Sequence, residues 1–356
     1  MNRIPQRSSL VTQTADVIRD EIRSGRWSRW LPGEYELCAQ LHVSRRTIRA
    51  ALEQLGRQGI LRCDQGKRRE IIGRHSRHRL SASKRVVLLM PVPLLSLSPF
   101  SVFLIDHLRE HLAEDGYILE THASRVLYRA RVPQELENLE ASLRPAGWVL
   151  LHSTEQMQRW FTERHRASVV VGSRYQDVQL PSVDTDYGAL CKHAVGRFLA
   201  RGSRRLVLLN PDPEAAGDEK TREGFLEAAG KTQLPDVRAE VVRHDGTVDS
   251  ICARVASLMA RAQPPTALLV SRPRHVLTVL GHLLRCGVRV PEDMAVISRD
   301  DDSFLEDVVP TVARYSRNPK VFASKVSRVV LQMVYGAKHF PDHKIMPSFV
   351  PGETLG

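Results

Sequence analysis

The chain has 356 residues, of which 42% are hydrophobic, and a formal net charge of +12. Its length predicts two or three compact units, and its hydrophobic content excludes a chain that is disordered throughout. Residues 1–80 hold 17 Lys and Arg against 8 Asp and Glu, whereas residues 81–356 hold 35 against 32. The excess positive charge therefore lies in the first fifth of the chain, where it favours a polyanionic partner such as DNA over a merely soluble basic surface.

The sequence lacks the features of a secreted or membrane-spanning protein. Residues 1–9 are polar and do not contain the apolar run of a signal peptide. The longest apolar stretch, residues 86–95, contains two prolines and is far shorter than the roughly 20 residues that cross a bilayer. The five cysteines are scattered without a Cys-x-x-Cys pair, as is typical of reduced thiols. We expect a cytoplasmic protein.

The first seventy residues predict three helices and a hairpin. Apolar residues at helical spacing predict a first helix over residues 11–22, and the break at residues 31–34 opens a second. A third helix begins after Ser44, a good N-cap, and ends before Gly59. Two short strands, at 60–63 and 69–72, are joined by a turn at 64–67. This order of elements is that of a winged helix-turn-helix.

The third helix carries basic and hydroxyl side chains on its first turn and a half, opposite its apolar stripe. A recognition helix presents its N-terminal residues to the major groove, where Arg binds guanine through two hydrogen bonds. A glycine lets the wing turn tightly, and the two basic residues after it neutralise phosphate. The candidate DNA-binding residues are Arg45, Arg46, Thr47 and Arg49 in the helix and Gly66, Lys67 and Arg68 in the wing.

About 60 residues around this helix resemble the GntR family of bacterial repressors. The similarity is carried by Leu-Pro-Gly-Glu at 31–34, Val-Ser-Arg-Arg-Thr-Ile-Arg at 43–49 and the step into the wing. The resemblance implies that Arg45, Thr47 and Arg49 contact an operator, with Gly66 and Lys67 in the wing. Tyr35 departs from the pattern, because many members carry a DNA-contacting Arg there. The alternative is a basic helical hairpin without a DNA role.

A polar, basic segment without helical periodicity separates the head from the rest of the chain. We expect a winged helix-turn-helix domain over 1–73, a linker over 74–84 and an effector-binding and dimerisation domain of two lobes over 85–356. His75 and His78 in the linker have no further ligand at metal-binding spacing, so they are read as solvated.

From residue 85 onward, short apolar runs alternate with helical segments. Continuous apolar strands of this kind are those that parallel sheets bury on both faces. Two successive β-α series predict two doubly wound lobes with a cleft between them. The first series has strands at 86–90, 118–121, 148–151 and 169–171, and the second at 206–209, 239–242, 268–270 and 295–297.

This part of the chain resembles the LacI-type, periplasmic-binding-protein-like effector domain from about residue 85 to the end. The similarity is carried by the residues at 182–188, 198–207, 222–225 and 287–301, of which Val-Pro-Glu-Asp at 290–293 is the most specific. A GntR-type head on a LacI-type body is an arrangement of sugar-responsive repressors. The expected fold class is therefore α/β: a winged helix-turn-helix followed by two lobes of periplasmic-binding-protein type.

The resemblance implies an effector site between the lobes. It places Arg222 as a clamp on effector hydroxyls or a carboxylate, with a surface ion pair as the alternative, and Asp300 as an acceptor at a strand end. It places Phe100 as a cap from the N-terminal lobe, for which ordinary core packing is the alternative.

Three departures from the LacI-type pattern change the expected effector. Arg272-Pro273 stands where Asn-Asp is usual, His244-Asp245-Gly246 where an aromatic often stacks, and Ser298-Arg299 where Gly-Phe precedes the two aspartates. Arg272 and Arg299 suit a phosphorylated or acidic effector rather than a neutral sugar. The departures are equally compatible with a pocket that has lost small-molecule binding.

The sequence supports neither catalysis nor a metal or cofactor. Asp300-Asp301-Asp302 and the pair His107 and His111 have no further ligands at suitable spacing. Neither a phosphate-binding loop nor a nucleophile elbow is present. We expect a homodimeric, sequence-specific DNA-binding repressor controlled by a carbohydrate-like or acidic effector. The alternatives are a regulator that has lost its effector and a cytosolic sugar-binding or sugar-modifying protein with a non-functional basic head.

Overall fold

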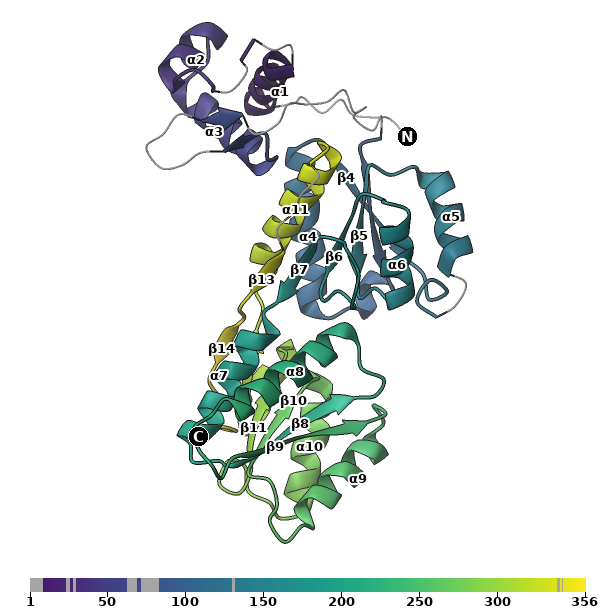
Figure 1. Cartoon of the computed structure of the whole chain (residues 1–356), viewed down its shortest axis with the longest axis vertical. Helices are drawn as coiled ribbons and strands as arrows, with labels where there is room; N and C mark the ends of the chain where they lie inside the picture. The colour runs from purple at the N-terminus through teal and green to yellow at the C-terminus, as the bar shows by residue number, and fades with distance from the viewer. Residues whose placement is uncertain are drawn as a thin grey trace.

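The computed structural model describes residues 9–23, 26–27, 30–62, 69–71, 83–129, 132–337, 340 and 342–356. They form a small helical head and two α/β lobes arranged end to end (Figure 1), with the head against the N-terminal lobe and the C-terminal lobe at the far end of the molecule. The predicted turn of the wing, with Gly66, Lys67 and Arg68, and most of the predicted linker lie outside the described residues.

The head has the predicted three helices and a two-stranded antiparallel sheet. Its elements are α1 (Leu10–Arg23), α2 (Glu34–Leu41), α3 (Arg45–Arg57), β1 (Leu61–Arg62) and β2 (Glu70–Ile71). Ile18, Leu37, Ile48 and Leu55 are fully buried and form its core together with their neighbours. Because the apolar residues of α3 lie on one side only, its basic side chains are left on the opposite side.

The N-terminal lobe is built on a six-stranded sheet in the order β13-β7-β6-β5-β3-β4, in which every pair is parallel. Its strands are β3 (Arg85–Met90), β4 (Ile118–Ala123), β5 (Gly147–Leu151), β6 (Ser168–Val171), β7 (Ser182–Thr185) and β13 (His343–Ile345). The central strands β3, β5 and β6 are nearly continuous apolar runs, as expected for strands that are covered on both faces.

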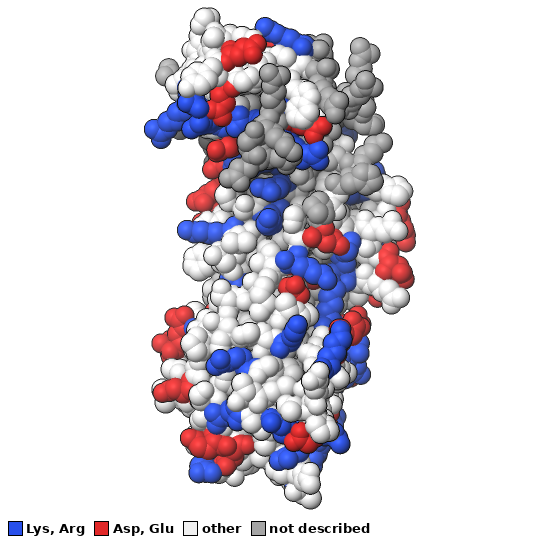
Figure 2. Space-filling view, turned by 60° about the vertical axis from the view of Figure 1, so that its left-hand side comes forward, with Lys and Arg blue, Asp and Glu red and all other residues white. Residues whose placement is uncertain are grey.

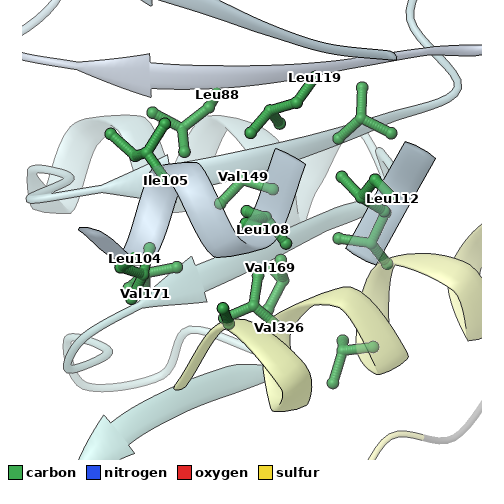
Figure 3. Packing of buried hydrophobic residues seen from close by; sticks show 14 of the residues in the cluster. Leu88, Leu104, Ile105, Leu108, Leu112, Leu119, Val149, Val169, Val171 and Val326 are labelled. Atoms are coloured by element: carbon green, nitrogen blue, oxygen red, sulfur yellow. The ribbon is translucent and has the colours of Figure 1, made fainter. Parts of the chain in front are cut away.

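Helices cover both faces of this sheet. On one face pack α4 (Pro99–Glu114) and α11 (Pro319–Val334), and on the other α5 (Val132–Leu143) and α6 (Glu155–Glu163). Figure 3 shows how the first face is closed: Leu104 and Leu108 of α4 and Val326 of α11 meet Val149 and Val169 of the sheet. A short 3-10 helix, Leu94–Ser96, precedes α4.

The C-terminal lobe has a second six-stranded sheet in the order β14-β12-β11-β10-β8-β9, parallel except for β14. α7 and α8 cover one face, and α9 and α10 cover the other. The elements are α7 (Tyr187–Ala200), β8 (Arg205–Pro211), α8 (Ala216–Gly230), β9 (Arg238–His244), α9 (Val248–Met259), β10 (Ala267–Val270), α10 (Pro273–Arg285), β11 (Ala295–Ser298), a 3-10 helix (Ser303–Glu306), β12 (Ala313–Ser316) and β14 (Ser348–Val350).

The chain passes between the lobes three times: from β7 to α7, from β12 to α11 and from β13 to β14. The N-terminal lobe therefore takes its last helix and its edge strand from the C-terminal end of the sequence, which is visible in Figure 1 as yellow ribbon beside blue and teal. The predicted fold class, a winged helix-turn-helix followed by two doubly wound lobes, is confirmed. No helix among the described residues has the length and apolarity to cross a membrane.

Candidate functional site

The first turn of α3 is fixed by its cap. Ser44 accepts a hydrogen bond from the main-chain N–H of Thr47 at 3.2 Å, and the two hydroxyl groups lie 2.8 Å apart. Thr47 is therefore held against the cap, while Arg46 beside it is exposed and its guanidinium has no ion pair or hydrogen bond within the described part of the chain. Among the described residues, the N-terminal end of the helix thus presents one unpaired guanidinium, that of Arg46.

Two further arginines of α3 that were predicted to contact DNA, Arg45 and Arg49, share one carboxylate with Arg69, which was not predicted. Glu34, the first residue of α2, accepts hydrogen bonds from Arg45 Nε at 3.1 Å, Arg49 Nε at 2.9 Å and Arg69 Nη1 at 3.2 Å. Its partial burial raises the pKa of this carboxyl, but the bonds from the three arginines outweigh that effect, so the net pKa lies below its usual value. Three positive charges on one negative charge leave a surplus of two at the surface of the head.

Tyr35, the departure from the family pattern, contacts the same cluster. Its hydroxyl accepts a hydrogen bond from Arg45 Nη1 at 3.0 Å, and the Arg45 guanidinium carbon lies 4.7 Å from the ring centroid. An aromatic ring stabilises a cation over its face. At the position where the GntR pattern often has an arginine, this chain thus has a ring that orients Arg45. Figure 2 shows acidic side chains beside basic ones on the head as well as on the lobes, in keeping with these pairings.

The C-terminal end of α3 is docked on the N-terminal lobe. Asp115, at the end of α4, accepts hydrogen bonds from Gln54 Nε2 at 3.0 Å and from Gln58 Nε2. All three residues are buried, at 6%, 4% and 1% exposure. At the edge of this contact Arg57 pairs with Glu114 at 2.9 Å. This junction was not predicted from the sequence, because a single Asp after a helix forms no recognisable pattern.

Arg19 of α1 extends the junction. It donates to Gln58 Oε1 at 2.7 Å, and its guanidinium lies 5.1 Å from the centroid of the Tyr335 ring at the end of α11. Burial raises the pKa of Asp115, while the bonds from Gln58 and Gln54 oppose that rise without cancelling it. The head and the N-terminal lobe are therefore joined by a buried polar network as well as through the chain.

A second cluster lies where the strands of the C-terminal lobe end. Arg299 is buried and donates to Asp218 at 2.7 Å, to Asp300 at 2.7 Å and to Thr221 Oγ1 at 3.1 Å. Arg272 donates to Asp218 at 2.6 Å and lies 4.0 Å from Asp300. Two carboxylates are thus held between two guanidiniums, and the predicted residues Asp300 and Arg272 are brought together.

The charges of this cluster shift one another's pKa values. Burial alone would raise the pKa of Asp300, but Arg299, Arg317 and Arg272 lower it to about 2. The pKa of His152, at the end of β5, is lowered to about 4 by desolvation and then by Arg317 and Arg272. At neutral pH both aspartates are therefore ionised and His152 is uncharged.

The N-terminal lobe meets this cluster through α8. Asp184 at the end of β7 accepts from Lys220 Nζ at 3.0 Å and from Ser173 Oγ at 2.7 Å. A Cβ atom on Gly217 would lie 3.1 Å from the Tyr187 hydroxyl and 3.3 Å from Ser173 Oγ, so the two lobes are in close contact here. The cluster therefore lies beside the contact between the lobes, at the position expected for an effector site.

Phe100 lies on the N-terminal side of this region. Its ring packs edge-on against Phe322 at 5.3 Å, and the Arg317 guanidinium carbon lies 4.1 Å from the ring centroid. Phe100 thus combines core packing, the alternative considered from sequence, with contact to a cation of the cluster. Its contact with an effector stays a prediction.

The structure does not bring Arg222 to Asp300. The side chain of Arg222 points to the outer edge of the lobe, where Nε donates to Glu214 at 3.0 Å. The preceding residue, Thr221, faces the cluster instead. Because neighbouring residues of a helix lie about 100° apart around its axis, a shift of one position moves a side chain from one face to another. Arg222 therefore makes an ion pair at the surface, which was the alternative considered from the sequence.

His244, where the sequence departs from the LacI-type pattern, packs against a second histidine in the structure. Its ring packs edge-on against His275, with centroids 4.6 Å apart, and both rings are buried. Burial, then His244 and Arg272, lowers the pKa of His275 to about 4. The pair is therefore uncharged at neutral pH. No group of three or more metal-ligating side chains is found in the part of the chain that is described.

Two segments match known families. Residues 10–71 match the bacterial regulatory proteins of the gntR family, and residues 195–355 match the periplasmic binding protein-like domain. The chain is 27% identical over 159 residues to the HTH-type transcriptional regulator CelR of Thermobifida fusca, covering 44% of this chain and 46% of CelR. It is 22% identical over 155 residues to the probable HTH-type transcriptional repressor ExuR of Bacillus subtilis, covering 44% of this chain and 46% of ExuR. The matched region thus spans about half the length of these relatives.

Solved structures share the fold. A complex of the transcriptional regulator CelR with cellobiose covers 98% of this chain and 100% of its own, with a TM-score of 0.64 and 20% identity. A regulatory protein of the LacI family from Chloroflexus aggregans covers 77% of this chain and 99% of its own, with a TM-score of 0.66 and 18% identity.

Proposed function

Because residues 10–71 are a gntR-family domain and residues 195–355 a periplasmic binding protein-like domain, we propose that this chain is a sequence-specific DNA-binding transcriptional regulator. The observation that carries the proposal is the arginine cluster on Glu34, with Arg46 exposed beside it at the open end of α3. Arginines that are held in place by a carboxylate and an aromatic ring are preorganised for base edges and phosphates. The relatives that are named as regulators and a repressor support a repressor in the bacterial cytoplasm rather than an enzyme.

The proposed organisation has a head over 1–73, a linker over 74–84 and an effector-binding body over 85–356. In the head we assign DNA contacts to Arg45, Arg46, Thr47 and Arg49, and we extend the assignment to Gly66, Lys67 and Arg68 of the wing on the resemblance alone. In the body we assign effector contacts to Asp300, Arg272 and Phe100.

A carbohydrate-like or acidic effector is the proposed ligand of the body. Asp300 offers a carboxylate to hydroxyls, and Arg272 offers donors to an anionic group. A related protein, CelR, is known in complex with cellobiose, which supports a carbohydrate ligand. One observation favours a regulator without an effector: Arg299 and Arg272 already neutralise both aspartates of the cluster. Arg222 is not part of this proposed site, because its side chain binds Glu214 at the outer edge of the lobe.

The proposed active form is a homodimer that is joined through the bodies. Leu277 and Leu284 support this arrangement, because they lie seven residues apart on one face of α10 and are 43% and 80% exposed. Phe103 of α4 is also 56% exposed. Twofold symmetry then directs the two heads to the two halves of a roughly palindromic operator.

Selection of bound sequences from a random DNA pool tests the proposal. The full chain is expected to enrich a roughly palindromic site, and Arg46→Ala is expected to lose selectivity, with a cost of about 1–3 kcal/mol if the arginine makes a bidentate base contact. The matched control is Arg125→Ala, which removes an equal charge from an exposed position on the turn after β4 of the N-terminal lobe. A chain that binds no DNA even at low salt would favour the alternative, a sugar-binding or sugar-modifying protein with a non-functional head.

A further inference from the structure

A pocket of about 510 Å³ lies on the outer edge of the C-terminal lobe. β9 is the last strand of the sheet, so one of its edges is unpaired, and α8 and α9 flank it. Four arginines line the pocket, namely Arg222, Arg243, Arg254 and Arg261, together with the apolar residues Leu226 and Leu258. The lobe forms the end of the molecule that is remote from the head (Figure 1), so this pocket is not part of the proposed DNA-binding surface.

The arginines outnumber the carboxylates that bind them. Glu214 is shared, because it accepts from Arg222 Nε at 3.0 Å and from Arg243 Nε at 3.3 Å. Arg261 binds Glu240, and Arg222 lies 3.8 Å from the exposed Glu223. The last of the four cations, Arg254, is exposed, and its guanidinium makes no ion pair or hydrogen bond with any described residue.

We propose that this pocket binds a small anion that carries at least two negative charges, of the class of phosphate esters and polyphosphates. The pocket volume lies within the range of small-molecule sites. Guanidinium groups match phosphate oxygens through paired hydrogen bonds. Arg254 supplies hydrogen-bond donors, together with Arg222 and Arg243, which share Glu214. Leu226 and Leu258 supply an apolar surface for the rest of an organic phosphate.

This site differs from the proposed effector site but is connected to it. α8 carries Thr221 on the side of the Asp218 cluster and Arg222 on the side of the pocket. Glu214 also accepts from Asn210 Nδ2 at 3.0 Å, and the same amide donates to the main-chain oxygen of Asp218 at 3.2 Å. An anion that competes with Glu214 for Arg222 and Arg243 therefore acts on a hydrogen-bond network that reaches Asp218.

Calorimetric titration of the full chain with inorganic pyrophosphate, at a salt concentration of about 150 mM to screen diffuse attraction, tests the proposal. The expected result is saturable binding of one pyrophosphate per chain. Arg254→Ala and Arg243→Ala are each expected to weaken it by about tenfold or more, the size of one lost charge-assisted pair. Because Arg254 is exposed and unpaired, its substitution leaves the fold intact, which a thermal melt verifies.

Arg285→Ala is the matched control, since it removes the same charge from the same lobe outside the pocket. Absence of saturable binding by the unsubstituted chain overturns the proposal. So does an equal loss in Arg285→Ala, which would identify diffuse charge attraction, or retention of binding in both pocket variants. DNA binding is measured separately on the same samples, so failure of the pocket and failure of the proposed regulatory function are distinguishable.

Discussion

Asp115→Ala is predicted to loosen the head from the N-terminal lobe. The substitution leaves the side-chain amides of Gln54 and Gln58 without their acceptor in a place where both are almost fully buried. Each unsatisfied buried donor costs about 1–3 kcal/mol. Part of this loss is offset, because burial of the Asp115 carboxylate is itself unfavourable, as its raised pKa indicates. We expect the docked arrangement to lose roughly 2 kcal/mol, near the low end for two donors.

A double-mutant cycle with Gln58→Ala isolates the interaction. The free energy of hydrogen exchange for peptides of α3 and α4 in the full chain is the quantity to measure. The two substitutions are expected to be coupled by about 1–2 kcal/mol. Asp106→Ala is the matched control, since Asp106 is an exposed carboxylate on α4 that, among the described residues, pairs with Arg109 alone. Additivity within about 0.5 kcal/mol, or an equal effect of Asp106→Ala, would refute the reasoning.

Three further predictions concern the charged clusters. Asp218→Asn removes a carboxylate from between Arg299 and Arg272, so unfolding measured in urea is expected to show a loss of about 3–5 kcal/mol, whereas a loss below about 1 kcal/mol would contradict the buried pairing. The pKa of Asp300 is about 2 in the folded chain against 3.8 for an ordinary carboxyl, so its contribution of roughly 2 kcal/mol is complete above pH 4 and is lost as the pH falls towards 2. The melting temperature of Asp300→Asn should therefore depend less steeply on pH across that range, as measured by thermal melts. Glu34→Gln releases three arginines for phosphate, so the slope of log affinity against log salt on non-operator DNA should steepen by about 0.9 for each new contact. An unchanged slope would show that the arginines stay away from DNA.

Local patterns and family resemblance predicted most of the fold. Apolar spacing placed the third helix of the head after Ser44, and the structure begins α3 at Arg45. The apolar runs of the two lobes became strands, because their side chains are buried between helices on both faces. β7, β12, β13 and β14 were not predicted, since their short sequences mix polar and apolar residues and the chain changes lobe next to them.

The polar contacts that define the sites were harder to predict. Glu34 lies 11 and 15 residues before Arg45 and Arg49, so only the packing of α2 against α3 brings them together. Arg299 was considered a possible ligand of an anion, but it is buried and paired with its neighbour Asp300 and with Asp218, which lies 81 residues away. The pairings with Glu34 and Asp218 depend on tertiary positions that no local spacing contains.

One consequence of the docked head is mechanical. α3 reaches from Thr47, a proposed DNA contact, to the lobe-facing Gln58, a distance of about 16 Å along the helix axis. A helix is stiff over this length, so it acts as a lever whose pivot is the contact with Asp115. A tilt of about 10° at the pivot displaces the far end by about 3 Å, which is the length of a hydrogen bond. A small rotation of the N-terminal lobe would thus be sufficient to carry the arginines out of register with the bases.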